Sequence, residues 1–146
     1  MSIITRADLE QRFGADEVLR LVDRNGYGLD DTAAVTAAIE DAEAEVIARI
    51  GPAVSGSIPD PAPALLKQVA SAVARYNLAR RDVDRDHPIY IAYRDAVETM
   101  AQIASGDVEL VDASGEAVAS PALAAYAPSH VFTDDALEDM LPEERT

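Results

Sequence analysis

Hydrophobic residues recur at helical spacing in five stretches of the chain, a pattern typical of a helical fold. The first stretch begins at Thr5, which has the spacing of a capping box with Asp8, and it ends at Gly14. A second short helix is predicted to follow, with Asp16 as its cap. Its expected apolar face consists of Val18, Leu19, Leu21 and Val22, with Arg20 pointing outward.

Three longer helices are predicted after these two. The third begins at Asp30 or Asp31 and ends near Ile50, where Gly51 and Pro52 stop it. Its expected buried residues are Val35, Ile39, Ala42, Val46 and Ile50, and its expected solvated outer face contains Glu40, Asp41, Glu43 and Glu45.

A connector rich in proline leads to the fourth and fifth helices. The fourth is predicted to begin with Pro63 and to end near Arg81, and the fifth to run from Pro88 to about Ser105, before Gly106. The expected buried stripes are Leu66, Val69, Ala70, Val73 and Tyr76 in the fourth helix, and Ile89, Tyr93, Ala96, Val97 and Met100 in the fifth.

The pattern changes after Gly106. Val108 and Leu110 alternate with acids before a Ser114-Gly115 turn, which predicts a weak β-hairpin. The expected fold is therefore an all-α bundle of about five helices over residues 1–106, followed by an extended acidic arm over residues 107–146. The arm ends in an expected short helix capped by Thr133, with candidate interface residues Val131, Phe132, Leu137 and Met140.

Composition limits the possible functions. The 146 residues fit one domain, and the absence of cysteine removes disulfides and thiolate zinc sites and favours an intracellular setting. No signal peptide and no apolar run of about 20 residues is visible, so a soluble protein without membrane partners is expected. The net charge of −15 disfavours specific nucleic-acid contact, because affinity for phosphate depends on lysine and arginine. The arm is more acidic than the rest, with 10 acids against one base.

The stretch LVDRNGYGLDD resembles a calcium loop at first sight. With Asp23 at position 1, Asn25 and Gly28 fit the pattern, but Tyr27 and Ala34 occupy positions that require oxygen ligands. A turn assisted by glycine is the better interpretation.

Other candidate chemistry is weak. His87 and His130 have no partner at ligand spacing, and Ser55 and Ser57 lie in the connector without a nucleophile motif, so no cofactor, metal or catalytic residue is expected. The basic residues Arg75, Arg80, Arg81 and Arg85 are interleaved with acids, which favours salt bridges within the chain or between subunits.

Three segments of the chain resemble the Mu-like head-tail connector family of bacteriophages and prophages. They are ITRADLEQRFGADEVLRLVDRNGYG near the start, IARIGPAVSGSIPDPAPALLKQVASAVARYNL in the middle and HVFTDDALEDM near the end. Residues 107–128 match weakly, and the acids at 134, 135, 138 and 139 stand where the family often has basic residues.

The resemblance implies a structural protein made in the host cytoplasm and placed in the neck of the virion. It would form a homo-oligomeric ring, dodecameric when assembled, that joins the portal to tail or neck proteins around the DNA channel. Two alternatives from other classes remain. The charge also suits an acidic regulatory protein that mimics DNA and binds a host enzyme, and clustered carboxylates would suit a small magnesium-dependent hydrolase or nuclease.

Overall fold

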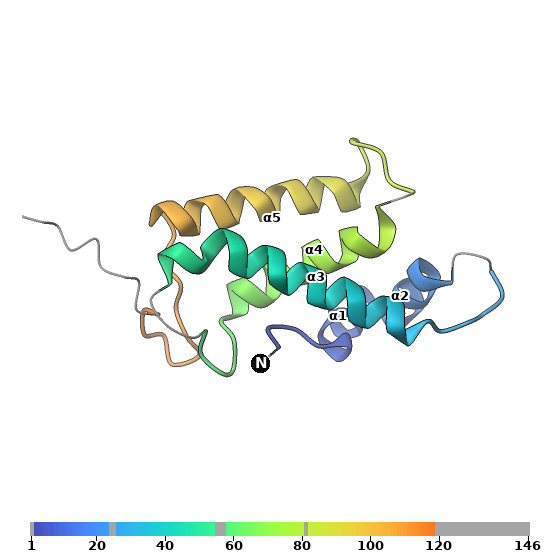
Figure 1. Cartoon of the computed structure of the whole chain (residues 1–146), viewed down its shortest axis with the longest axis horizontal. Coiled ribbons are helices and arrows are strands. Elements are labelled where there is room, and N and C mark those ends of the chain that lie inside the picture. The colour runs from blue at the N-terminus through green and yellow to red at the C-terminus, as the bar shows by residue number, and fades with distance from the viewer. Residues whose placement is uncertain (1, 24–25, 55–57, 81, 119–146) are drawn as a thin grey trace, which may run out of the picture.

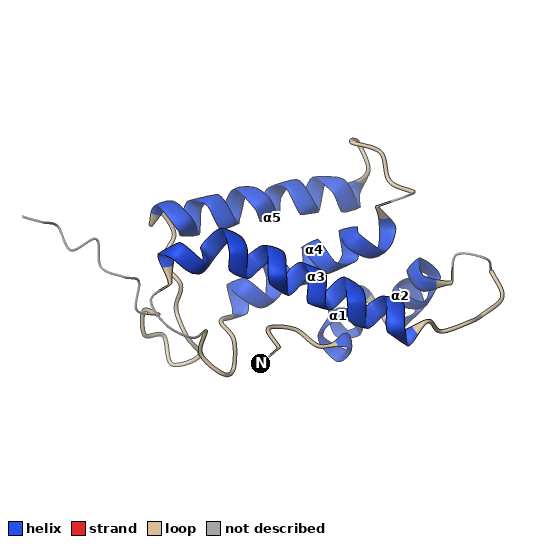
Figure 2. Cartoon of the chain, viewed as in Figure 1, coloured by secondary structure: helices blue, strands red, loops and turns tan. Residues whose placement is uncertain are grey.

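The described part of the chain forms five α-helices, as the hydrophobic pattern predicts (Figures 1 and 2). The computed structural model describes residues 2–23, 26–54, 58–80 and 82–118. The helices are α1 (Arg6–Phe13), α2 (Ala15–Val22), α3 (Thr32–Ile50), α4 (Ala64–Ala79) and α5 (Pro88–Ser105), and the short 3-10 helix η1 (Gly51–Ala53) directly follows α3.

The core lies among the three long helices, each of which contacts the other two. In Figure 1, α3 and α5 extend in the same direction, and the short helices α1 and α2 lie where α3 begins. The expected apolar stripe of α3 is buried along its whole length. Most residues of the expected stripes of α4 and α5 are buried as well. Tyr76, Tyr93 and Val97 are half-buried.

Local capping explains most helix ends. The N–H of Asp8 donates to the Thr5 hydroxyl at 3.3 Å and the N–H of Thr5 donates to the Asp8 carboxylate at 2.8 Å, which confirms the capping box. The Asp31 carboxylate caps α3 by accepting from the N–H of Ala34 at 3.0 Å. Gly106 ends α5 in the left-handed conformation, with φ of 82°.

Two predicted boundaries are wrong. Asp16 does not cap α2, because the helix begins at Ala15 directly after Gly14, whose φ of 91° reverses the chain without a side-chain cap. Asp16 lies instead in the first helical turn, where a negative charge favours the helix dipole. Pro63 precedes α4 rather than starting it, because its ψ of 140° is extended, and α4 ends at Ala79.

The segment after α5 forms a minimal hairpin at the end of the bundle. Its β pairing within the described residues is a single antiparallel bridge between Val111 and Ala117, and the N–H of Val118 donates to the carbonyl of Leu110 at 2.7 Å. Leu110 is buried in the hydrophobic core. The core therefore continues past Gly106, and a separate domain for residues 107–146 stays a prediction.

Candidate functional site

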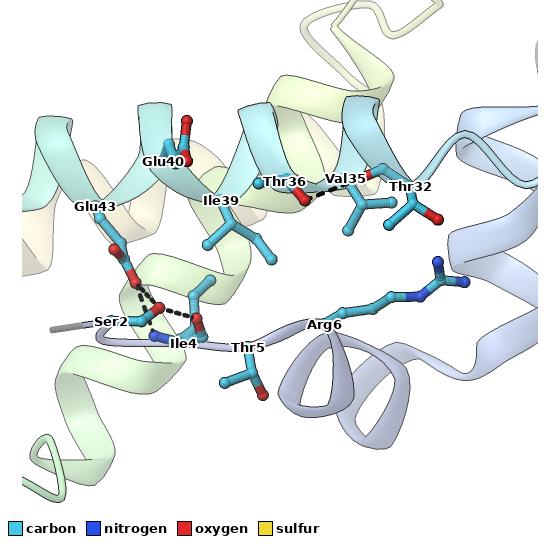
Figure 3. A pocket seen from close by; sticks show the side chains of 10 residues that line it. All are labelled: Ser2, Ile4, Thr5, Arg6, Thr32, Val35, Thr36, Ile39, Glu40 and Glu43. Carbon is cyan, nitrogen blue, oxygen red and sulfur yellow. Dashed lines mark hydrogen bonds between the residues drawn. The ribbon is translucent and has the colours of Figure 1, made fainter.

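The N-terminal residues lie along α3 and form one wall of a pocket of about 380 Å³ (Figure 3). Oε1 of Glu43 accepts hydrogen bonds from the N–H groups of Ile3 and Ile4, at 2.5 and 3.0 Å, and from the hydroxyl of Ser2 at 2.6 Å. Both isoleucines are buried. Glu43 therefore holds the N-terminal segment against α3.

This role contradicts the expected solvated face of α3. Glu43 and Glu45 are both half-buried and bonded to other segments, whereas Glu40 and Asp41 are exposed as expected. The sequence contains a weak signal for this partial burial, because Glu43 directly follows the buried Ala42 and Glu45 directly precedes the buried Val46.

Arg6 borders the same pocket, but its charge is already neutralised. Its guanidinium donates to Glu10 at 2.6 Å and to Asp30 at 2.9 Å. The hydrogen bond with Asp30, and to a smaller extent the one with Glu10, raises the pKa of Arg6 above its ordinary value. Glu40 of α3 also borders the pocket, but it is exposed and Figure 3 shows its side chain pointing away from the N-terminal segment. The Ser2 hydroxyl of this lining donates to Oε1 of Glu43, and the same oxygen accepts from two backbone N–H groups, so these hydrogen bonds serve to hold the N-terminal segment in place.

Of the four arginines singled out from the sequence, Arg75 has a defined role within the chain. Its Nε donates to Oε1 of Glu17 at 2.6 Å, and its guanidinium lies 4.5 Å from the ring centroid of Phe13. These contacts tie α4 to α2 and α1. Arg80 and Arg85 are exposed, so an intersubunit role for them stays a prediction.

Other predicted site residues lie outside the described residues. They are Arg81 and the arm residues Val131, Phe132, Leu137 and Met140. Ser55, Ser57 and His130, for which no catalytic or metal role is expected, also lie outside the described residues. His87 is described, and its Nδ1 accepts from the N–H of Ile89 at 3.2 Å. His87 therefore caps α5, a role the sequence reasoning missed.

The loop after α2 is a turn held by one carboxylate. Both oxygens of Asp23 accept backbone hydrogen bonds, from Tyr27 at 3.0 Å and from Gly28 at 2.7 Å. Gly26 and Gly28 have positive φ of 68° and 69°, which confirms the predicted turn assisted by glycine. In the described part of the chain, no group of three or more histidine, aspartate or glutamate side chains is placed to hold a metal ion.

Three tyrosines form a cluster that sequence reasoning also missed. Tyr76 of α4 stacks on Tyr93 of α5 with centroids 4.1 Å apart, and Tyr90 meets Tyr76 edge-on at 5.9 Å. The Tyr93 hydroxyl donates to Glu45 of α3 at 3.0 Å. Burial raises the pKa of Tyr93, and the hydrogen bond to Glu45 raises it further. The cluster therefore connects all three long helices.

Comparison with known proteins identifies a family. The family model described as Bacteriophage Mu, Gp36 matches residues 4–127, a range that contains all five helices. A search of curated proteins found no match. Among the described residues, no helix is long and apolar enough to cross a membrane.

Proposed function

The chain belongs to the bacteriophage Mu Gp36 family, and from this membership we propose that it is a non-catalytic structural subunit of the phage neck. In this role a ring of identical copies joins the portal of a DNA-filled head to the next tail component. The observation that carries the proposal is the family match across the whole helical bundle.

The charge of the chain is compatible with a position around the DNA channel. Twenty-seven acids against 12 lysines and arginines give a net charge of −15. A ring of such subunits would repel the phosphate backbone, so that DNA passes through without forming lasting contacts.

A ring also needs an interface that closes. Identical subunits close into a ring when one surface of each copy contacts a different surface of the next. The arm carries apolar residues, Val131, Phe132, Leu137 and Met140, that suit such a contact or a contact with the portal, because apolar side chains dominate the energetics of protein interfaces.

A DNA mimic receives less support from the structure. Mimicry requires carboxylates presented along one continuous surface, but several acids of this chain accept hydrogen bonds from the chain's own groups instead. They are Asp8, Glu10, Glu17, Asp23, Asp30, Asp31, Glu43, Glu45 and Asp112.

Co-sedimentation with tailless, DNA-filled heads tests the connector role. Full-length protein is expected to pellet with the heads, and a version truncated after Pro128 is expected to stay in the supernatant because it lacks the apolar arm residues. Heads assembled without portal provide the control and should bind neither version.

Each other outcome has a defined meaning. Binding of both versions supports the connector role and shows that the helical bundle, rather than the arm, contacts the head. Binding of neither version, or equal binding to heads without portal, contradicts the proposal.

A further inference from the structure

A groove of about 330 Å³ lies on the surface of α4, between the end of α1 and the middle of α5. Phe13 and Leu65 contribute its large apolar side chains, and Ala72, Ala92 and Ala96 line it with small ones. Small side chains allow another helix to approach closely, because the distance between packed helices depends on the side chains at the contact. The groove therefore suits an amphipathic helix.

The chain itself contains a segment of matching character. In residues 131–141, Ala136, Leu137, Met140 and Leu141 recur at helical spacing after the expected Thr133 cap, and Phe132 directly precedes the cap, where it can pack against Leu137 as in a hydrophobic staple. Val131 lies outside this pattern. On a helix with 3.6 residues per turn the apolar positions that follow the cap share one side. The acids Asp134, Asp135, Glu138 and Asp139 fall on the opposite side.

The end of the described chain lies close enough for this segment to reach the groove. Val118 and Ile103 line one pocket together, so the chain leaves the bundle beside the last turns of α5. The groove begins one turn away, at Thr99, and Ala92 at its far end is about 17 Å from Ile103 along the helix. Residues 119–130, when extended, span about 40 Å, which exceeds that distance.

Charge at the groove edge agrees with an acidic occupant. Arg12 lines the groove and is exposed, and it has no ion-pair partner within the described residues. On the opposite edge, Asp95 is paired with Arg94 at 3.3 Å. An acidic helix seated in the groove would gain a contact with Arg12 at its solvent side.

We propose that residues 131–141 dock into the groove between α1, α4 and α5 of their own chain, with an amphipathic helix that follows the Thr133 cap and with Phe132 packed beside its first turns. Docking within one chain is favoured over docking between copies because the linker gives the segment a high effective concentration near its own groove. This docking concerns the isolated subunit, so it stands or falls independently of the connector role.

Paramagnetic relaxation measured by NMR tests this docking directly. The chain has no cysteine, so Glu138→Cys creates a unique site for a nitroxide on the acidic side of the segment. In dilute, isotopically labelled protein, the amide signals of residues 65–72 and 92–99 are expected to lose most of their intensity. Signals of Thr36 and Glu40, on the outer side of α3, should keep theirs.

A matched pair of second substitutions separates docking from chance proximity. Phe132→Ser removes an apolar contact and is expected to restore the groove signals, whereas Asp135→Ser changes the acidic side and should leave them broadened. Neither substitution touches the described helices, so misfolding of the bundle does not confuse the result.

Two results would overturn the proposal. Full signal intensity in the groove of the single-labelled protein would show that the segment does not dock there. Broadening that appears only when nitroxide-bearing and isotopically labelled molecules are mixed would assign the groove to a second copy of the chain.

Discussion

Oε1 of Glu43 lies 2.5 Å from the backbone nitrogen of Ile3, so one carboxylate in the middle of α3 fixes the start of the described chain. The same oxygen accepts from the next backbone N–H group, that of Ile4. Two consecutive buried residues are thus supplied with hydrogen bonds that no helix or strand provides.

Replacing this carboxylate is expected to destabilise the bundle. Glu43→Ala leaves the N–H groups of Ile3 and Ile4 without their acceptor and should lower the free energy of unfolding by about 2 kcal/mol. Glu40→Ala, one turn earlier on the exposed side of α3, is the control and should change it by less than about 0.5 kcal/mol. Urea denaturation of both variants measures the difference, and equal midpoints would contradict the assigned role of Glu43.

Arg75 is expected to act within the subunit rather than between subunits. Arg75→Ala removes the ion pair with Glu17 and the contact with the Phe13 ring, and should cost about 1 kcal/mol because both contacts are partly exposed. Arg80→Ala, at the exposed end of α4, serves as the comparison and should have little effect on the monomer. Thermal unfolding at low protein concentration measures both, and a loss that grows with protein concentration would instead indicate an intersubunit contact.

Local rules predict most of this fold because most of its helix ends depend on neighbours in sequence. The Thr5 and Asp8 capping box, the Asp31 cap and the Gly106 stop each involve residues within a few positions of one another. The missed boundary at Asp16 has the same local origin, because Gly14 turns the chain sharply enough to start the next helix without a side-chain cap.

The contacts at the candidate site connect residues that are far apart in sequence. Ile3 and Glu43 are 40 positions apart, and Glu17 and Arg75 are 58 apart. Periodicity predicts which side of α3 is buried, but it gives no information on which distant segment covers the edge of that side. The sequence therefore places Glu43 on a helix without indicating that the N-terminal residues pack beside it.

Acid is expected to remove the contribution of Asp8. The hydroxyl of Thr5, above all, lowers the pKa of Asp8 below its ordinary value of 3.8, with Lys67 adding to the shift. A carboxyl whose pKa is lower in the folded state stabilises the fold above its unfolded pKa and loses that effect as the pH falls through its folded pKa. Asp8→Asn should therefore cost about 1 kcal/mol at neutral pH, and the difference from wild type should shrink below pH 3.8. A difference that stays constant across a pH series of urea denaturations would contradict this prediction.

Alkaline pH is expected to reveal the contact between Tyr93 and Glu45. Burial, with the hydrogen bond to Glu45, raises the pKa of Tyr93 above its ordinary value of 10.0. The Tyr93 hydroxyl therefore contributes its full stabilisation of the fold below pH 10. This contribution is lost as the pH rises through the folded pKa of Tyr93, where a tyrosinate would face the Glu45 carboxylate.

Tyr93→Phe separates the hydroxyl from the ring. At neutral pH it should lower the free energy of unfolding by about 1 kcal/mol while the stacking on Tyr76 remains. As the pH rises through the folded pKa of Tyr93, this difference in stability should shrink, because the wild-type hydroxyl ionises and the variant has no group to ionise there. Tyr90→Phe is the control at neutral pH, since the Tyr90 hydroxyl has no hydrogen bond within the described residues. Parallel stability curves for Tyr93→Phe and wild type would contradict the assigned contact.

The charge of the chain should prevent it from binding DNA even under conditions that favour electrostatic contact. Low ionic strength strengthens attraction between a basic surface and phosphate, and it strengthens repulsion from an acidic surface equally. Fluorescence anisotropy of a labelled duplex should therefore stay unchanged as the protein is added at low salt, while polylysine raises it in the same buffer. Binding that weakens as salt is added would reveal a basic surface on the subunit. In that case a neck ring would hold DNA through phosphate contacts during passage, and the charge argument for the connector role would fail while the family membership remained.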